Sequence, residues 1–319
     1  MTSVRRAVID VGTNSVKLLV ADVVGKEVLP VIEQSCQTRL GRGLYKFHRL
    51  QPEAIEATVE AIKTFSELAT QHKAGALRVV ATSAAREAVN ASELTEAVER
   101  ACHAQVEVIS GEQEADWAFL GVTTDSRLAQ TPVLLVEIGG GSTQFLLGRG
   151  DKQHFRGSYR LGTIRLLDKF PHSDPPTAKE LSECRSYLLQ FLHSNVVAAL
   201  APALRELTAS QGERPIFVAT GGTAAILARI EAGMEDYDRD RIEAIRLSRA
   251  SLRGRAESLW GMRLEDRKQL PGLPANRADV ILLGVLVYEA VLETFDFPEL
   301  QVSTRGLRFA ALLDATRPR

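Results

Sequence analysis

The sequence predicts an α/β protein built from two similar halves, and three observations support this. Strand-like apolar runs alternate with segments of helical apolar spacing along the chain. A strand–turn–strand pattern near the N-terminus recurs in the middle of the chain, and so does a strand–turn–helix pattern that follows it. The length of 319 residues fits about two domains, each large enough to bury a core.

The first repeated element is VIDVGTNSVKLLV at residues 8–20, which aligns without gaps on LVEIGGGSTQFLL at residues 135–147. The alignment places Asp10 on Glu137, an offset of 127 residues (137 − 10). Both segments consist of a strand-like run, a turn of small residues and a second strand-like run, which predicts a hairpin in each half.

The second repeated element is VVATSAA at residues 79–85, matched by FVATGGT at residues 217–223. Thr82 falls on Thr220, an offset of 138 residues (220 − 82). Each is an apolar strand that enters a small-residue turn and then an Ala-rich helical pattern. Because the two elements recur in the same order at similar offsets, they predict a duplicated half.

The remaining elements follow from apolar spacing and turn residues. Helices are expected at 52–72 and 278–295, where apolar residues recur with helical periodicity. A further helix begins after Ser110, which can form a reciprocal capping box with Gln113. The expected strands cover 4–11, 15–23, 78–82 and 105–109 in the first half, and 133–138, 143–149 and 216–220 in the second.

Charge and cysteine usage exclude several classes of protein. The net charge of −1 provides no global field for nucleic acid or for an anionic membrane. Cys36, Cys102 and Cys184 are scattered without metal-type spacing, which fits a reducing compartment. The apolar run at the start is too short for a signal peptide, and the run at 280–288 is too short to span a bilayer. We expect a cytoplasmic protein with no nucleic-acid or membrane partner.

The stretch VLLVEIGGGSTQFLLG at 133–148 predicts a phosphate-binding loop. Glycines allow a sharp turn, and consecutive amide N–H groups in such a turn form a concavity that binds anions. A Walker loop needs Gly-Lys-Ser/Thr and a dinucleotide fingerprint needs a helix directly after the glycines, whereas a strand-like run follows here. A phosphate-binding hairpin that occurs twice, facing itself across a cleft, is the arrangement of actin-like ATPases and sugar kinases. A tight turn without ligand remains the alternative for this stretch alone.

An ordered set of motifs resembles the exopolyphosphatase and guanosine pentaphosphate phosphohydrolase (Ppx/GppA) family, and the chain length corresponds to its two-domain short form. The match covers nearly the whole chain. The motifs are DVGTNSVKLLV (10–20), TRLGRGL (38–44), ATSAAREAVN (81–90), ISGEQEA (109–115), EIGGGSTQ (137–144), LGTIRL (161–166), ATGGT (219–223), PGLPANRADVILLG (271–284) and STRGLRFA (303–310).

The resemblance implies the actin-like ATPase (ASKHA, RNase H-like) fold, with two similar α/β domains and the active site in the cleft between them. We place the domains at 1–125 and 126–319, with the boundary after the helix that begins at Ser110, and expect the C-terminal helix to pack back on the first domain. The implied reaction is hydrolysis of the terminal phosphoanhydride of inorganic polyphosphate or guanosine pentaphosphate (pppGpp), which releases orthophosphate. Both substrates present a terminal phosphoanhydride, so the sequence leaves both open. A small-molecule kinase of the same superfamily and a non-catalytic binder of polyphosphate or (p)ppGpp are the alternatives, and a homodimer is the candidate assembly.

The resemblance also assigns roles to residues. It implies that Glu114 is the general base that orients the attacking water, although acids are favoured in any first helical turn by the helix dipole. The implied phosphate-binding set combines loop N–H groups, hydroxyls and two arginines, because guanidinium groups match phosphate bidentately. This set is Thr13, Asn14, Ser15, Arg39, Arg86, Gly139, Gly140, Gly141, Ser142, Thr143, Gly221, Gly222 and Thr223.

Asp10 and Glu137 are expected to hold Mg²⁺ or Mn²⁺, with Gln144 as a further oxygen ligand. The family pattern is Asp-Ile-Gly-Gly-Gly-Ser-Thr-Glu, and this chain departs from it at both ends. Glu137 extends the carboxylate by one methylene, and Gln144 removes one negative charge while keeping a carbonyl oxygen. The two changes bear directly on metal affinity and on activity.

Overall fold

The computed structural model describes residues 2–314 and contains two sheets that share one topology. The first sheet comprises β1 (Val4–Val11), β2 (Val16–Val24), β3 (Glu27–Cys36), β4 (Leu77–Ala81) and β5 (Val106–Val108), in the order β3-β2-β1-β4-β5. The second comprises β6 (Val133–Ile138), β7 (Thr143–Arg149), β8 (Lys152–Tyr159), β9 (Ile216–Thr220), β10 (Arg246–Ser248) and β11 (Glu299–Val302), in the order β8-β7-β6-β9-β11-β10.

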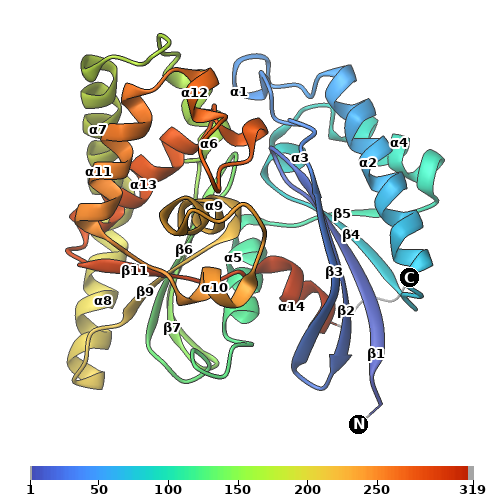
Figure 1. Ribbon diagram of the computed structural model, residues 1–319. Coiled ribbons are helices and arrows are strands. Elements are labelled where there is room, and N and C mark those ends of the chain that lie inside the picture. The colour runs from blue at the N-terminus through green and yellow to red at the C-terminus, as the bar shows by residue number, and fades with distance from the viewer. Residues whose placement is uncertain (1, 315–319) are drawn as a thin grey trace.

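Apart from the added edge strand β10, the second sheet repeats the first strand for strand. In each half the first three strands are antiparallel, and the fourth strand runs parallel to the first. Figure 1 shows the two halves side by side. The predicted class, two similar α/β domains, is confirmed by this arrangement.

The helices cover both sheets. They are α1 (Leu44–Phe47), α2 (Pro52–Gln71), α3 (Ser83–Glu87), α4 (Ala91–Cys102), α5 (Gly111–Val122), α6 (Thr163–Lys169), α7 (Ala178–Leu192), α8 (Ala198–Gln211), α9 (Gly221–Ala232), α10 (Arg239–Ala244), α11 (Arg249–Gly261), α12 (Leu264–Arg267), α13 (Ile281–Thr294) and α14 (Leu307–Leu313). A π-helical turn at His193–Val197 joins α7 to α8, and a 3-10 turn at Ala275–Arg277 precedes α13.

Of the eleven strands in residues 2–314, the sequence predicted seven and missed four. The bounds of β1, β6, β7 and β9 agree with the expected ranges, and those of β2, β4 and β5 differ by one residue at each end. The strands β3, β8, β10 and β11 were not expected. β3 is an edge strand of mostly exposed residues and β8 is an edge strand of exposed and half-buried residues, so neither has the apolar alternation that marks a strand. β10 and β11 are only three and four residues long. At α5, Ser110 accepts the N–H of Gln113 at 3.1 Å, but the hydrogen bonds of residues 2–314 do not include the reciprocal bond. The expected capping box is therefore half formed.

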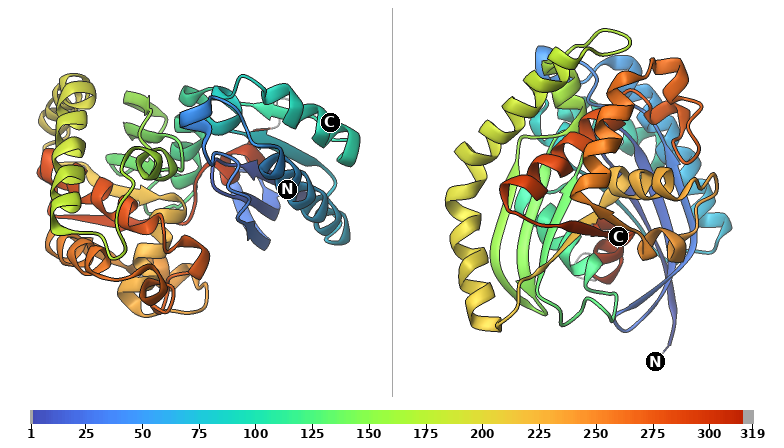
Figure 2. Two further views of the ribbon diagram at one scale, coloured as in Figure 1. Left: turned by 90° about the horizontal axis from the view of Figure 1, so that it is seen from above. Right: turned by 60° about the vertical axis from the view of Figure 1, so that its left-hand side comes forward.

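The helical segment Ala178–Gln211 is long and apolar enough, by length and composition alone, to cross a membrane. Core helices pass the same test, and this one carries a polar face as well as a buried one. Figure 2 shows the segment along the outer edge of the second half. Its buried residues recur every three or four positions against the core of that half: Cys184, Leu188, Leu192, Val196, Leu200, Leu204 and Leu207. The absence of a membrane partner stays a prediction.

Two helices cross between the halves behind the cleft. Helix α14, near the C-terminus, packs on the first sheet, where Phe309 joins the cluster that contains Val8 and Leu19. Helix α5 packs on the second sheet, where Phe119 joins a cluster with Leu135. This exchange ties the halves together through their cores. The predicted bounds of the domains, 1–125 and 126–319, stay predictions, and residues 315–319 lie outside the described part.

Candidate active site

The two glycine-containing loops form the same turn in both halves. In the loop between β1 and β2, the N–H of Gly12 donates to the carbonyl of Ser15 at 3.0 Å. In the loop between β6 and β7, the N–H of Gly139 donates to the carbonyl of Ser142 at 2.9 Å. The repeat predicted from the sequence is thus also a repeat of backbone geometry.

The residues that flank these loops also correspond. Asp10 on β1 faces Lys17 on β2, and Glu137 on β6 faces Gln144 on β7. Directly opposed residues of an antiparallel pair project from the same face of the sheet. The first hairpin therefore opposes its carboxylate with an ammonium group, whereas the second opposes its carboxylate with an amide.

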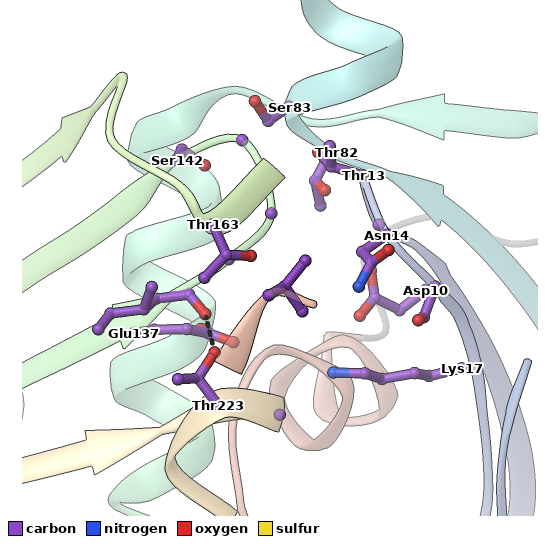
Figure 3. A pocket seen from close by; sticks show the side chains of 18 of the residues that line it. Asp10, Thr13, Asn14, Lys17, Thr82, Ser83, Glu137, Ser142, Thr163 and Thr223 are labelled. Carbon is purple, nitrogen blue, oxygen red and sulfur yellow. Dashed lines mark hydrogen bonds between the residues drawn. The ribbon is translucent and has the colours of Figure 1, made fainter. Parts of the chain in front are cut away.

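The loops meet at a cavity between the halves, shown in Figure 3. Asp10, Asn14 and Lys17 point toward it from the first half, and Glu137 and Thr223 lie on the side of the second half. The structure brings the following predicted residues together in its walls: Asp10, Thr13, Asn14, Ser15, Glu114, Glu137, Gly139, Gly140, Gly141, Ser142, Gly222 and Thr223.

The second loop touches the first half at Gly141. A Cβ on this residue would lie 2.1 Å from the Tyr45 hydroxyl and 2.3 Å from Ser83 Oγ. Those distances are far below van der Waals contact, so only glycine permits this approach. The close packing sets the second loop against Tyr45 and Ser83 of the first half, and both loops line the same cavity.

Four of the predicted phosphate ligands, Arg39, Arg86, Thr143 and Gly221, lie outside the cavity walls, and Arg86 is paired with Glu114 instead. Arg39 forms an ion pair with Asp279 at 2.7 Å. Thr143 is fully buried and donates its hydroxyl to the carbonyl of Leu161. Gly221 has a φ of +87° and abuts the Glu137 carboxylate, where a Cβ would lie 3.0 Å from Oε1. Their assigned contacts with phosphate stay predictions.

Glu114 lies in the first turn of α5, 7% exposed, with its carboxylate in the cavity wall. It accepts a hydrogen bond from Arg86 Nη2 at 3.1 Å. Burial raises the pKa of Glu114 to about 8, because the Arg86 charge that opposes this shift does not outweigh desolvation and the nearby Glu137 charge adds to it. Glu114 is therefore a carboxyl group that exchanges a proton near neutral pH.

Asp10 and Glu137 each have a buried carboxylate oxygen, Asp10 Oδ1 and Glu137 Oε2, without a hydrogen-bond partner in the described structure. Burial raises the pKa of both groups, that of Glu137 to about 7, and the Lys17 charge works against the shift in each. Unpaired buried carboxylate oxygens are costly and fit a hard cation. Within residues 2–314 no cluster of three His, Cys, Asp or Glu side chains is placed to hold a metal. A cation here would be held by two carboxylates together with water or ligand oxygens, as is usual for Mg²⁺.

Gln144, the third predicted metal ligand, does not line the cavity. Its Nε2 donates to Ser142 Oγ at 2.8 Å and to Ser158 Oγ at 3.3 Å, and its Oε1 is buried without a partner. The amide thus fixes the side chain of Ser142 from behind the loop. Its role as a metal ligand stays a prediction.

Two cations in the cavity were not assigned by the sequence. Arg277 donates from Nη2 to Ser15 Oγ at 2.5 Å and so reaches from the second half to the first loop. Burial lowers the pKa of Arg277 to about 10, and it also lowers that of Lys17. A signal for each was present, since the repeat alignment pairs Lys17 with Gln144 and Arg277 lies inside the PANRAD motif.

The arrangement suits a polyanion whose end carries a phosphoryl group. Two turns present N–H groups and hydroxyls, while Lys17 and Arg277 supply positive charge where little water competes. Glu114 lies in the wall of the same cavity, where it can take a proton from a water molecule. These are the requirements of phosphoryl transfer to water.

Comparison with known proteins agrees with this chemistry. A family model described as the Ppx/GppA phosphatase family matches residues 19–317. The chain is 35% identical over 300 residues to Exopolyphosphatase 2 of Mycobacterium tuberculosis, covering 91% of this chain and 90% of that protein. It is 28% identical to guanosine-5'-triphosphate,3'-diphosphate pyrophosphatase of Aeromonas salmonicida, of which it spans 57%. The crystal structure of the Aquifex aeolicus Ppx/GppA family member superimposes with a TM-score of 0.77 at 30% identity, covering 98% of this chain and 97% of that one.

Proposed function

The chain belongs to the Ppx/GppA phosphatase family and is a phosphoanhydride hydrolase with the actin-like ATPase fold, and we propose that it removes orthophosphate from the end of inorganic polyphosphate or pppGpp. The observation that carries the proposal is the placement of Glu114 in the wall of a cavity that both duplicated loops also line. Polyphosphate is the first substrate to test, because the relative at 35% identity is named an exopolyphosphatase.

The terminal phosphoryl group lies between the two loops. Backbone N–H groups of Asn14 and Gly140 and the hydroxyl of Ser142 contact its oxygens, and Arg277 reaches the adjoining phosphate. These contacts neutralise the charge on the phosphate oxygens and hold the anhydride bond in line with a water molecule at Glu114. In this proposal the attacking water lies at Glu114, and the rest of the substrate chain lies on the opposite side of the terminal phosphorus.

In the hydrolytic step the water oxygen forms a bond to the terminal phosphorus, and the bond from that phosphorus to the bridging oxygen breaks. Glu114 accepts a proton from the water, and the bridging oxygen leaves with the shortened chain. A base with a pKa near the working pH is efficient in such a transfer. Burial of Glu114 supplies that pKa.

Asp10 and Glu137 are the residues that would hold Mg²⁺ or Mn²⁺, since they face one cavity from opposite hairpins and each has an unpaired buried oxygen. When bound, the cation supplies charge neutralisation to the phosphate oxygens. Lys17 points into the same cavity in Figure 3, where its charge interacts with both carboxylates, and it supplies part of the same charge from the protein itself. A cytoplasmic location and a homodimer also stay predictions.

A non-catalytic binder of polyphosphate or (p)ppGpp is the second candidate. It is favoured by one observation, that Gln144 stands outside the cavity where the family pattern has a carboxylate, so the site has one anionic ligand fewer. Such a protein would bind the polyanion tightly and leave it intact.

Orthophosphate release from long-chain polyphosphate and from pppGpp, measured side by side with Mg²⁺ and with Mn²⁺, tests the proposal. We expect release from at least one substrate and loss of that release in Glu114→Gln. Tight binding of either compound without release would support the binder instead, and ADP formation from ATP with a small acceptor would support a kinase.

A further inference from the structure

A second cavity lies directly behind the phosphate loop of the second half. Its volume is about 480 Å³, and it shares Ser142 with the catalytic cavity. Its walls come from both halves, with Tyr45 and Arg86 on one side and Ser158 and Arg165 on the other. The exposed side chains of His48, Glu112 and Arg160 stand at its rim, so it opens to solvent.

Three arginines and two glutamates give this second cavity its charge. Arg165 is fully engaged, since its Nη2 donates to both oxygens of Glu87 at 2.8 Å and its Nε donates to the carbonyl of Gly141. Arg160 is different, because its side chain is 80% exposed and comes only within 3.5 Å of Glu87, which Arg165 already neutralises. Arg160 therefore presents a solvent-exposed guanidinium at the mouth of the second cavity, where Glu112 is the other exposed charge.

Arg86 connects the two cavities. Its Nη1 donates to the carbonyl of Ile109 at 2.7 Å, and its Nη2 donates to Glu114 Oε2 at 3.1 Å. The guanidinium lines the second cavity, whereas the Glu114 carboxylate lines the first. The Arg86–Glu114 pair and Ser142 thus form the partition between them.

The direction of attack decides which species reaches this partition. In an in-line displacement the attacking water and the leaving oxygen lie on opposite sides of the phosphorus. Water at Glu114 therefore places the freed orthophosphate against the partition, while the shortened chain lies on the far side. When Glu114 accepts the proton of the water it becomes neutral, and Arg86 loses the charge that held it. The anion then present beside Arg86 is the product.

We propose that the second cavity binds the orthophosphate product and is the route by which it leaves, with Arg86 passing from Glu114 to phosphate and Arg160 drawing phosphate to the mouth. The inference rests on the proposed function, because it needs hydrolysis at Glu114. It explains how product can depart while the remaining polyphosphate chain still occupies the other side of the catalytic cavity.

The test compares Arg160→Glu with Lys152→Glu. Lys152 is an exposed residue at the start of β8, about 25 Å along the strand from Arg160. Lys152→Glu therefore makes the same reversal of charge at a place that lies away from both cavities. Affinity for inorganic phosphate is measured by calorimetry on each purified variant without substrate. Steady-state and single-turnover release of orthophosphate from polyphosphate are then measured on the same preparations.

We expect Arg160→Glu to weaken phosphate binding at least about fivefold, since an attractive charge becomes a repulsive one next to a dianion. It should also lower the steady-state rate relative to the single-turnover rate, because cleavage precedes product release. Lys152→Glu should match wild type in both measurements. Equal phosphate affinity in the two variants would overturn the inference. A higher KM for long-chain polyphosphate in Arg160→Glu, with unchanged phosphate affinity, would also overturn it, because that result would place the polyphosphate chain in the second cavity. If no anhydride is cleaved by wild type, the proposed function fails, and the phosphate-binding comparison alone decides whether the second cavity is an anion site.

Discussion

The raised pKa of Glu114 predicts a specific pH dependence. A general base acts in its ionised form, and kcat/KM reports the ionisation of the free enzyme. With a pKa of about 8, roughly a tenth of Glu114 is ionised at pH 7 and half at pH 8. We therefore expect kcat/KM for polyphosphate to rise about fivefold from pH 7 to pH 8 and to level off above pH 9. A glutamate with an ordinary pKa would give no rise in this range.

Substitution isolates the residue responsible. Glu114→Gln keeps the shape and an oxygen that can accept the Arg86 hydrogen bond, but it cannot take a proton from water. We expect kcat to fall by about 10²- to 10⁴-fold, the usual cost of losing a general base, and the residual activity to lose the rise between pH 7 and pH 8. Glu112→Gln is the matched control for proton transfer, because Glu112 lies in the same helical turn but does not line the catalytic cavity. Orthophosphate release at constant ionic strength measures both variants, and a rise that survives in Glu114→Gln would refute the assignment.

Three further predictions concern stability, substrate binding and metal. The pKa values of Glu114 and Glu137 in the folded protein are about 8 and about 7, above their values in the unfolded chain. Their protonated forms therefore contribute to folding stability at pH 5, and this contribution is lost as the pH rises toward 8. The Tm of the metal-free wild type should fall between pH 5.5 and pH 8.5, and the Tm of Glu114→Gln should fall less. An equal decline in both proteins would contradict the ionisation of Glu114 as the cause. Ser15→Ala removes the acceptor of Arg277 in the cavity, so it should raise KM for polyphosphate several-fold with little change in Tm, and a large loss of Tm with unchanged KM would mark Ser15 as purely structural. Gln144→Glu, alone or with Glu137→Asp, should lower the Mg²⁺ concentration for half-maximal phosphate release, because a third anion beside Asp10 and Glu137 strengthens a hard-cation site. Identical half-saturation values would remove position 144 from metal binding.

The sequence predicted the repeated hairpins because their signals are local. A buried central strand is a run of apolar residues, and the turn that follows it needs glycines, so both features can be read within about a dozen positions. The equivalence of Asp10 and Glu137 followed from one ungapped alignment, and the structure places the two residues at the same position in corresponding hairpins.

The features that the sequence did not predict depend on contacts between distant segments. Arg277 reaches Ser15 across 262 positions of chain, and no local pattern distinguishes it from other arginines. The second cavity is likewise assembled from α1, α3, α5, β8 and α6, so its existence follows only from the packing of the two halves. Lys17 stands opposite Asp10 on the neighbouring strand, and the sequence alone does not distinguish such a pair from an ion pair on the surface.

The central claim is that water held at Glu114 attacks the terminal phosphorus of the substrate. A single turnover of short polyphosphate in water enriched in oxygen-18, with both products analysed by mass spectrometry, tests it most directly. We predict one labelled oxygen in the released orthophosphate and none in the shortened chain, because the bridging oxygen leaves with the chain. Label in the end of the shortened chain would mean attack on the penultimate phosphorus and would contradict the account.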